Sequence, residues 1–345
     1  MDKLKRMEEL VKEINMYSEY YYTLDNPIIS DSEWDALYDE LVLLEKETGT
    51  VLKDSPTQKV GGEIKTSFKK VEHIKKLYSL DKCSDVNTLN KWFADMKKAG
   101  ADKFTLEYKY DGLRIAVTYD NGKLVLGATR GNGTIGEDVT AQIKTIHSLP
   151  KSIKYKGRLV VTGEALMRKS VLKSLNETAI EALKNERNAA AGAIRNLNTN
   201  ITKERNLDLF LYDILDIEDD FLKTQEQVRN FLIDNGFSIF DYFVCSSNTE
   251  NLISEIEIVD EARTKLDILI DGLVFKVDDL NLREKIGSTN KFPKWAKAYK
   301  FKAEEVTSKL ENIVWQVGRT GKITPIAEIQ PVELAIGVIL PVRPT

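Results

Sequence analysis

The sequence predicts an α+β protein in which antiparallel sheets with flanking helices follow a small all-α module. Three observations support this. The first ~65 residues carry apolar side chains at helical spacing, whereas short β-rich runs dominate from about residue 68. Strands and helices do not alternate regularly after that point, which disfavours a doubly wound parallel sheet. The 345 residues are enough for two or three domains at ~100–200 residues each.

The N-terminal segment predicts two helices. Apolar residues recur at helical spacing behind the capping residue Asp2: Leu4, Met7, Leu10, Val11 and Ile14. Asp25-Asn26-Pro27 ends this helix, and Ser30 with Glu33 forms the capping-box signature of a second one. The second helix should bury four residues: Trp34, Leu37, Leu41 and Leu44. The connector with Pro56, Gly61 and Gly62 marks a domain boundary.

The remaining chain mixes both types of element. A helix over 85–98 should turn Val86, Leu89, Phe93 and Met96 inward and end at Gly100. Further helices are expected near 168–185, near 225–235, where Thr224 and Gln227 form a capping box and Gly236 ends the helix, and near 250–264. Strands are expected at 104–108, 113–119, 124–129, 159–162, 207–215, 239–245, 273–277 and 298–301, with a hairpin turn at Asp120-Asn121-Gly122. The segment from about 306 is strand-like and basic.

Composition excludes several classes of protein. With 42 % apolar and 30 % charged residues the chain is globular, and no apolar run reaches the ~18–20 residues of a membrane span. The N-terminus lacks the apolar core of a signal peptide, so we expect a cytoplasmic protein with no membrane partner. Two cysteines and two histidines disfavour a disulfide framework, a four-thiolate zinc site and His-based catalysis. A net charge of −4 leaves nucleic-acid binding to be argued from local sequence.

The chemistry is expected around Lys109-Tyr110-Asp111-Gly112. A lone K-x-D-G is weak evidence, because such a tetrapeptide is also a common surface turn. Four charged residues follow it in order, however: Arg130, Glu164, Lys276 and Lys300. Lys276 and Lys300 interrupt apolar strand runs, where a charge is costly unless an anion pairs with it. Each alone could be a snorkelling lysine. Together they indicate a pocket for a polyanion.

These residue types suit a lysine nucleophile that attacks a phosphoanhydride. Neighbouring cations and partial burial favour the neutral, nucleophilic amine and stabilise negative charge on the attacked phosphate. Carboxylates suit ribose hydroxyls, an adenine amino group or waters on Mg²⁺. Attack by Lys109 would give a lysyl-nucleotide phosphoramidate.

The chain resembles the N-terminal part of a bacterial NAD⁺-dependent DNA ligase. The resemblance covers almost the whole length and rests on ordered motifs: Ser55-Pro56-Thr57-Gln58 with Val60-Gly61-Gly62, Ser79-Leu80-Asp81, Lys109-Tyr110-Asp111-Gly112, Thr129-Arg130-Gly131-Asn132-Gly133 with Gly136-Glu137-Asp138-Val139-Thr140, Arg187-Asn188-Ala189-Ala190-Ala191-Gly192 and Gln316-Val317-Gly318-Arg319-Thr320-Gly321. It implies a nucleotidyltransferase fold of the ATP-grasp-like type and a partial OB-fold, since the chain stops at Thr345. The implied domains are 1–66 (helical NAD/NMN recognition), 67–305 (adenylation) and 306–345 (truncated OB-fold).

The resemblance implies a role for each site residue. Lys109 would be adenylated, and Asp111 would orient it or a metal-bound water. The residues around the AMP half would be Glu107 at the adenine amino group, Tyr212 stacked on adenine, Arg130 and Glu164 at the ribose, and Lys276 and Lys300 beside adenine and the α-phosphate. Tyr212 could equally be a core tyrosine. Three arginines would contact phosphates of NAD⁺ or DNA, and a fourth the DNA backbone: Arg187, Arg195, Arg263 and Arg319.

The helical module would hold the nicotinamide mononucleotide (NMN) half, the leaving group. The matching positions are Tyr21, Tyr22, Asp31, Ser32, Glu33, Trp34 and Asp35, with Ser79 and Leu80 across the pocket. The chain departs from the family at three positions, with Tyr22 in place of the usual His, Trp34 in place of Tyr and Tyr108 in place of Pro. An aromatic side chain at position 34 can still stack on nicotinamide, although Trp34 could also be helix core.

The implied activity is NAD⁺-dependent DNA ligation, with AMP passed to the 5′-phosphate of a nick in the full-length enzyme. The implied cofactors are NAD⁺ and Mg²⁺ (or Mn²⁺), with no direct protein metal site and no zinc; NAD⁺ phosphate and waters near Asp111 and Glu164 would hold the metal. Nicked double-stranded DNA is the expected partner, and a monomer working at the nucleoid is the expected form. Two alternatives stay open: an ATP-dependent polynucleotide ligase or capping-type enzyme, and a non-catalytic nucleotide- or DNA-binding homologue. The segment Asp31–Asp35 argues against the first, and the complete set of pocket lysines and carboxylates against the second.

Overall fold

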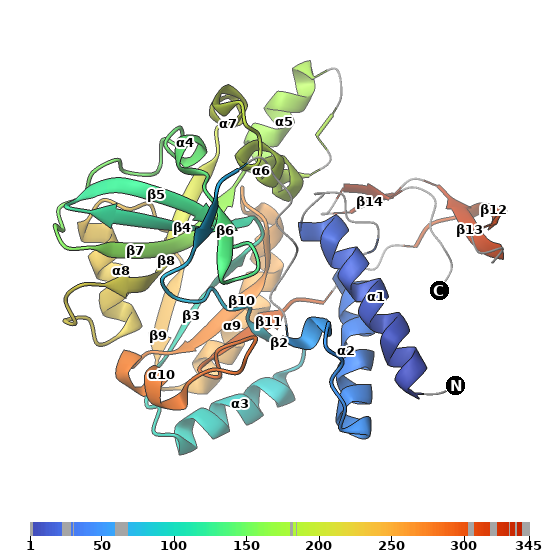
Figure 1. Ribbon diagram of the computed structural model, residues 1–345, viewed down its shortest axis with the longest axis horizontal. Helices are drawn as coiled ribbons and strands as arrows, with labels where there is room; N and C mark the ends of the chain where they lie inside the picture. Colours follow the sequence, from blue (N-terminus) through green and yellow to red (C-terminus); the bar gives the residue numbers. More distant parts are fainter. Residues whose placement is uncertain are drawn as a thin grey trace.

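The computed structural model (Figure 1) describes residues 3–22, 29, 31–58, 68–179, 182–183, 185–302, 307–317, 323–330, 332–334 and 337–339. Its helices are α1 (Lys3–Tyr22), α2 (Asp31–Thr48), α3 (Val86–Lys98), α4 (Thr140–Ile143), α5 (Lys169–Thr178), α6 (Glu186–Ile194), α7 (Thr199–Glu204), α8 (Gln225–Asp234), α9 (Thr249–Ala262) and α10 (Leu280–Ile286), with 3₁₀ turns at Pro56–Gln58 and Arg263–Lys265. Of the helices described, none is long and apolar enough to cross a membrane.

Helices α1 and α2 pack side by side and form the N-terminal module (blue in Figure 1). The predicted apolar face is confirmed, because the following residues share one core: Met7, Leu10, Val11, Ile14 and Leu41, with Trp34, Leu37 and Leu44 partly buried against them. Leu4, which we expected inside, is 46 % exposed. Helix α2 ends at Thr48, whose hydroxyl contacts Met7 Sδ at 3.5 Å, and Glu47 just before it pairs with Lys3 at 3.2 Å. The expected caps Asp2 and Ser30 lie outside the described residues.

Two antiparallel sheets form the central body. The five-stranded sheet has the order β2 (Asp81–Cys83), β11 (Ala296–Lys300), β10 (Ile270–Val277), β3 (Phe104–Tyr110) and β9 (Phe243–Ser246). The four-stranded sheet has the order β5 (Lys123–Thr129), β4 (Leu113–Asp120), β7 (Leu159–Leu166) and β8 (Asp208–Ile217). Within these sheets only the short β11–β2 pair is parallel. The predicted antiparallel α+β class is therefore confirmed.

The predicted hairpin at Asn121-Gly122 joins β4 and β5. Asp120 pairs with Lys123, and both turn residues have positive φ, at 49° and 71°. Such a turn matches the right-handed twist of the strands it joins, which explains why the Asn-Gly signal was reliable. A two-stranded ribbon of β1 (Lys70–Glu72) and β6 (Ile135–Glu137) lies beside this sheet.

Several helices differ from their predicted form. In α3, Val86 is 37 % exposed because it directly follows the N-cap Asp85 at the open end of the helix. Trp92, which was not among the residues expected inside, is buried. The helix expected near 168–185 ends at Thr178, and a separate helix, α6, starts after the N-cap Asn185. Helices α4, α6, α7 and α10 were not predicted. The capping residue Thr224 of α8 is confirmed, since its hydroxyl accepts a hydrogen bond from the Gln227 amide.

Strand alternation separates each sheet into a core face and a charged face. Along β3, Phe104, Leu106 and Tyr108 enter the core that α3 and α9 cover, so Glu107 and Lys109 lie on the opposite face. The same alternation places Lys276 of β10 and Lys300 of β11 on that opposite face, next to the core residues Phe275 and Tyr299. The second core packs against the other sheet, which leaves the charged faces of the two sheets to meet each other.

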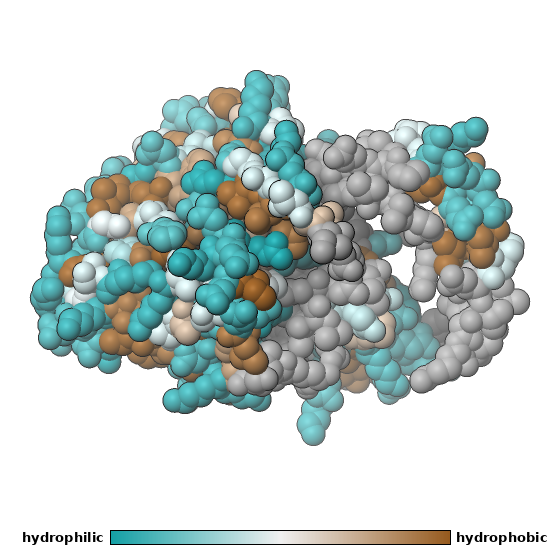
Figure 2. All heavy atoms as spheres, turned by 90° about the horizontal axis from the view of Figure 1, so that it is seen from above, coloured by the Kyte–Doolittle hydropathy of each residue, from teal (hydrophilic) through white to brown (hydrophobic). Residues whose placement is uncertain are grey.

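The C-terminal segment is strand-rich, as expected. Strands β12 (Leu310–Val317) and β13 (Ile323–Ile329) form one antiparallel hairpin, and β14 (Val332–Leu334) and β15 (Gly337–Ile339) form another. Figure 2 shows apolar and charged residues mixed over the visible face of the described residues rather than gathered into one continuous band.

Candidate active site

Lys109 lies near the end of β3 and is hydrogen-bonded to the carboxylate of Asp271. Its Nζ donates to both carboxylate oxygens of Asp271, each at 2.6 Å. Gly272 of β10 pairs with Lys109 and Ile270 with Tyr110, so Asp271 is an extra residue at a register shift. A bulge of this kind re-aims a side chain, and here it directs Asp271 at the lysine.

A second lysine lies close to the Asp271 carboxylate. Lys300 on β11 lies opposite Gly272, and its Nζ is 3.9 Å from Asp271 Oδ2. Burial raises the pKa of Asp271, but the ammonium groups of Lys109 and Lys300 outweigh burial and hold that pKa below its usual range. The strands β3, β10 and β11 thus assemble two lysines around one ionised carboxylate.

Asp111 and Glu164 are two further acidic residues of the site, and Arg187 acts on both of them. Asp111 follows β3 and accepts a hydrogen bond from Arg187 Nη1 on α6. Glu164 lies on β7, where burial raises its pKa to about 7 against the opposing effect of Arg114 and Arg187. Lys109 and Arg130 also lower the pKa of Glu164, which puts the predicted Arg130 within electrostatic range of Glu164.

A buried ion pair lies deeper between the sheets. Lys276 Nζ donates to Glu107 Oε2 at 2.8 Å and stands 3.5 Å from Asp213 Oδ2 on β8. Glu107 is 8 % and Lys276 4 % exposed. Burial raises the pKa of Glu107, with Lys276 opposing that change. Glu107 Oε1 has no hydrogen-bond partner among the described residues, so one carboxylate oxygen is available to a donor.

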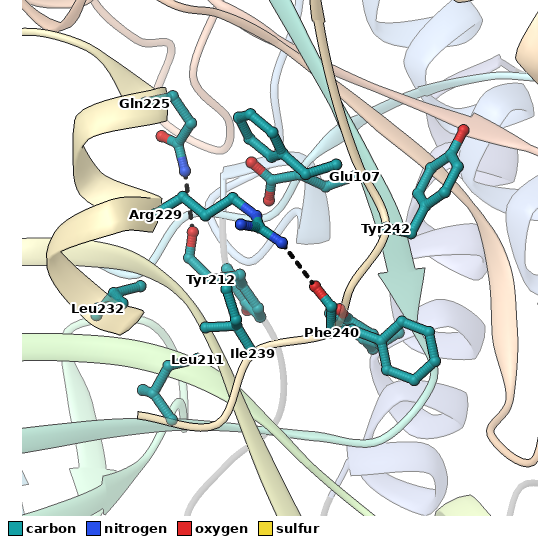
Figure 3. Close-up of a pocket in the computed structure, with 11 residues that line it drawn as sticks. Glu107, Leu211, Tyr212, Gln225, Arg229, Leu232, Ile239, Phe240 and Tyr242 are labelled. Atoms are coloured by element: carbon teal, nitrogen blue, oxygen red, sulfur yellow. Dashed lines mark hydrogen bonds between the residues drawn. The ribbon is translucent and has the colours of Figure 1, made fainter. Parts of the chain in front are cut away.

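Tyr212 on β8 lies beside this pair. Lys276 Nζ is 5.5 Å from the centre of the Tyr212 ring, and the Tyr212 hydroxyl is 3.4 Å from Glu164 Oε2. A pocket adjoins the ring and is lined by Glu107 and by mainly aromatic and apolar side chains, with Gln225 and Arg229 from α8 (Figure 3). Tyr110 stacks near Tyr212 with 6.2 Å between ring centres. Tyr212 is thus at the site.

The N-terminal module contacts the central body through aromatic rings and lysines. Trp34 stacks on Tyr38 at 5.1 Å. Lys82 lies over the Trp34 ring at 5.6 Å and Lys291 over the Tyr38 ring at 3.4 Å. The backbone N–H of Ser79 donates to the Lys291 carbonyl at 3.1 Å. Trp34 and Ser79 thus both lie near Lys291, and Leu80 directly follows Ser79.

Other predicted residues are placed less closely or not at all. Glu33 is exposed on α2. Arg195 Nε is 4.0 Å from Glu137, and Arg263 pairs with Asp260 at 2.6 Å, over the ring of Phe301; neither forms a described contact with Lys109. Arg319 and, for their side chains, five residues of the module lie outside the described residues: Tyr21, Tyr22, Asp31, Ser32 and Asp35.

Comparison with known proteins identifies the family. The model of the NAD-dependent DNA ligase adenylation domain matches residues 65–304. The model of the DNA ligase-like, N-terminal NAD⁺-binding domain matches residues 1–61, and that of the NAD-dependent DNA ligase OB-fold domain matches residues 307–340. The chain belongs to the NAD-dependent DNA ligase family. The fold implied by the resemblance, a nucleotidyltransferase domain between a helical module and a partial OB-fold, is thereby confirmed.

Curated relatives agree with this membership. A DNA ligase of Alkaliphilus metalliredigens is 48 % identical over 339 residues, covering 97 % of this chain and 51 % of the relative. A DNA ligase of Finegoldia magna is 46 % identical over 346 residues, covering 97 % and 52 %. The chain therefore spans about half the length of these DNA ligases. Among solved structures, "mycobacterial DNA ligase D complexed with ATP and MES" aligns over 67 % of this chain and 63 % of that chain at 13 % identity and a TM-score of 0.36, too distant to bear on the assignment.

Asp271 and Asp213 are two residues of this candidate site that sequence reasoning missed. Asp271 directly precedes the run Gly272–Lys276, so its signal was present in a motif from which only Lys276 was taken. Asp213 follows Tyr212 within a strand, where strict alternation would place it on the core face. Its contact with Lys276 depends on a register shift, which no alternation pattern reveals.

Proposed function

We propose that this chain carries out the adenylation step of an NAD⁺-dependent DNA ligase. Lys109 would first release a proton from its ammonium group to solvent, and the neutral Nζ would then attack the α-phosphorus of NAD⁺, so that an N–P bond forms, the P–O bond to NMN breaks, and lysyl-AMP and NMN result. The observation that carries the proposal is the lysine held at 2.6 Å by Asp271, with Lys300 3.9 Å from the same carboxylate. Asp271 would hold the ammonium in line until NAD⁺ arrives, and Asp111 would orient the same lysine.

The AMP half would occupy the space between the charged faces of the sheets. Glu107 would accept a hydrogen bond from the adenine amino group, which is supported by its partnerless Oε1 among the described residues. Tyr212 would stack on adenine. Arg130 and Glu164 would hold the ribose hydroxyls.

Cationic side chains would hold the phosphates. Lys276 and Lys300 would line the adenine and α-phosphate side, where Lys300 stabilises charge that develops on the attacked phosphate. Arg187, Arg195 and Arg263 would contact phosphates of NAD⁺ or DNA, since an arginine fork suits phosphate geometry.

We further propose Mg²⁺ (or Mn²⁺) as the metal. Asp111 and Glu164 offer the oxygen ligands that Mg²⁺ prefers, and Mg²⁺ is commonly held by one or two carboxylates, substrate phosphate and water. Among the described residues, no group of three or more metal-ligating side chains is found. When bound, the metal would neutralise phosphate charge.

The helical module would hold the NMN half, with Trp34 as the aromatic platform. The other module positions are Tyr21, Tyr22, Asp31, Ser32, Glu33 and Asp35, facing Ser79 and Leu80. We place the domain boundaries at 1–66, 67–305 and 306–345, since the core of α1 and α2 is separate from those of the central body. In the full-length enzyme, a monomer, AMP would pass to the 5′-phosphate of a DNA nick, with Arg319 on the DNA backbone.

Intact-mass measurement tests the proposal. The purified chain is incubated with NAD⁺ and Mg²⁺, beside a sample with ATP. We expect the mass of one AMP to be added in the NAD⁺ sample and not in the ATP sample. The adduct should be absent from Lys109→Ala. It should persist in Lys103→Ala, which changes an exposed lysine just before β3.

Three results would contradict it. An AMP adduct formed from ATP would move the chain to the ATP-dependent class, and an adduct that persists in Lys109→Ala would refute the nucleophile. A protein purified already adenylated would lose AMP on addition of NMN. No adduct before or after incubation would refute the adenylation activity of this chain.

A further inference from the structure

Two buried polar side chains near β8 have been given no role in binding or catalysis so far. Gln225, the first residue of α8, is 1 % exposed, and Arg283 on α10 is 5 % exposed. Burying an amide and a guanidinium is costly unless both are hydrogen-bonded. Their partners therefore indicate what these side chains do.

The two side chains form a relay that ends at Tyr212. Arg283 Nε donates to the Val277 carbonyl at 2.6 Å and its Nη1 to Gln225 Oε1 at 2.9 Å, with the guanidinium over the Trp295 ring at 4.3 Å. Gln225 Nε2 donates to the Tyr212 backbone carbonyl at 3.0 Å, as Figure 3 shows. Because arginine can only donate, the amide of Gln225 must turn its oxygen to Arg283 and its NH₂ to Tyr212.

Tyr212 needs this external partner because it lies at a register shift. Thr162 of β7 pairs with Asp213 and Gly163 pairs with Leu211, so Tyr212 is the extra residue between them. The extra residue of a bulge is left without its ladder partner, and the strand bends locally. The bond from Gln225 therefore replaces support that a regular strand would receive from its neighbour.

We propose that Gln225, oriented by Arg283, is a positioning residue that fixes the bulge at Tyr212 and so sets the platform for adenine. This rests on the proposed function, in which Tyr212 stacks on adenine. Neither side chain would touch the reacting atoms. Loss of the Gln225 side chain should therefore weaken the binding of adenine-containing substrate more than it slows the transfer of AMP.

The test is Gln225→Glu, which keeps the shape and the acceptor for Arg283 but removes the donor to the Tyr212 carbonyl. We expect KM for NAD⁺ in adenylation to rise about tenfold, equivalent to about 1.4 kcal/mol, while the rate at saturating NAD⁺ stays within about threefold of wild type. In the reverse reaction, KM for NMN should not change, because NMN carries no adenine. A purely structural role would lower the active fraction instead.

Gln227→Glu is the matched control. Gln227 lies on the same helix and uses Oε1 as an acceptor of the Lys223 amide at 2.7 Å, so glutamate can keep its bond and KM for NAD⁺ should stay unchanged. If Gln225→Glu does not fold, Arg283→Lys keeps the charge but not the fork that joins Val277 to Gln225. It should raise KM for NAD⁺ about threefold in the same direction.

Three outcomes would overturn the inference: an unchanged KM for NAD⁺ in the folded variant, an equal rise in KM for NMN, or a loss confined to the maximal rate. The proposed function fails separately, and earlier, if the wild-type chain forms no AMP adduct.

Discussion

The buried pair of Glu107 and Lys276 allows a sharp prediction about stability. Lys276 has two anionic neighbours, Glu107 at 2.8 Å and Asp213 at 3.5 Å. In Lys276→Met both carboxylates lose their shared ammonium, and removal of one partner of a buried pair costs about 3–5 kcal/mol. In Glu107→Leu the lysine keeps Asp213, so we expect only about 1–3 kcal/mol, the cost of a buried donor that loses one partner. The lysine substitution should therefore cost clearly more.

The two costs should also differ in their pH dependence. Burial already raises the pKa of Glu107 in the intact pair. Without Lys276 the folded-state pKa rises further above the unfolded one, so stability is full at low pH and is lost as pH rises towards the folded-state pKa. The cost of Lys276→Met should grow as pH rises above the ordinary pKa of a glutamate, about 4, by at most about 1.4 kcal/mol per pH unit. The cost of Glu107→Leu should instead fall as pH rises, because the wild type loses stability through the raised pKa of Glu107 and the variant does not.

Equilibrium urea unfolding, followed by near-UV circular dichroism, measures both costs. Lys297→Met is the control, since Lys297 also forms a strand ion pair but its partner Asp81 has a 36 % exposed side chain and stays hydrated. Its cost should be smaller than that of Lys276→Met. Equal costs for Lys276→Met and Glu107→Leu, or a cost of Lys276→Met that does not change with pH, would refute the reasoning.

Three further predictions follow from the site. Asp271→Asn should slow the formation of lysyl-AMP at least about tenfold in single-turnover mass measurements, because Lys109 loses the carboxylate that orients it; a wild-type rate would contradict this. Burial raises the pKa of Glu164 to about 7, so in a Lys109→Arg background, which keeps the positive charge that acts on Glu164, calorimetry should show NAD⁺ affinity rising from about pH 6 to about pH 8 as the acceptor carboxylate ionises, and Glu164→Gln should remove that rise. Lys291→Met should raise KM for NMN about threefold to tenfold by removing the cation from Tyr38, and an unchanged KM would show that this contact does not seat the module.

Sequence alone predicted the parts of this site that obey simple periodicity. Lys276 and Lys300 stand out because each interrupts an apolar strand run, and the structure places both on the charged face of one sheet. The hairpin at Asn121-Gly122 was predictable because its turn needs two positive φ angles. Helix α6 was not predicted, because its alanine-rich sequence has no amphipathic stripe and its N-cap, Asn185, is a weak signal by itself.

Contacts between distant elements could not be predicted at all. Gln225 and Arg283 are 58 residues apart, and nothing in either local sequence indicates the other. The same holds for Lys109 and Asp271, which β-sheet pairing brings together across 162 residues. Such partners depend on strand order and register, and register is set by the packing of whole faces rather than by any one residue.

The register shifts at Tyr212 on β8 and at Asp271 on β10 explain how two strands bring so many side chains into one site. A regular strand offers a site only every second residue. On β8 the extra residue lets Tyr212 and Asp213 face Lys276 in succession, while Leu211 and Ile214 on either side both pack in the core. On β10 the extra residue is Asp271, between Ile270 and Leu273, which also both reach the core. Its neighbour must then be glycine, because a Cβ on Gly272 would lie 2.1 Å from the Tyr299 carbonyl. Both the partner of the proposed nucleophile and the proposed adenine platform therefore depend on an interruption of the sheet, which is why strand patterns located the lysines but not the side chains that orient them.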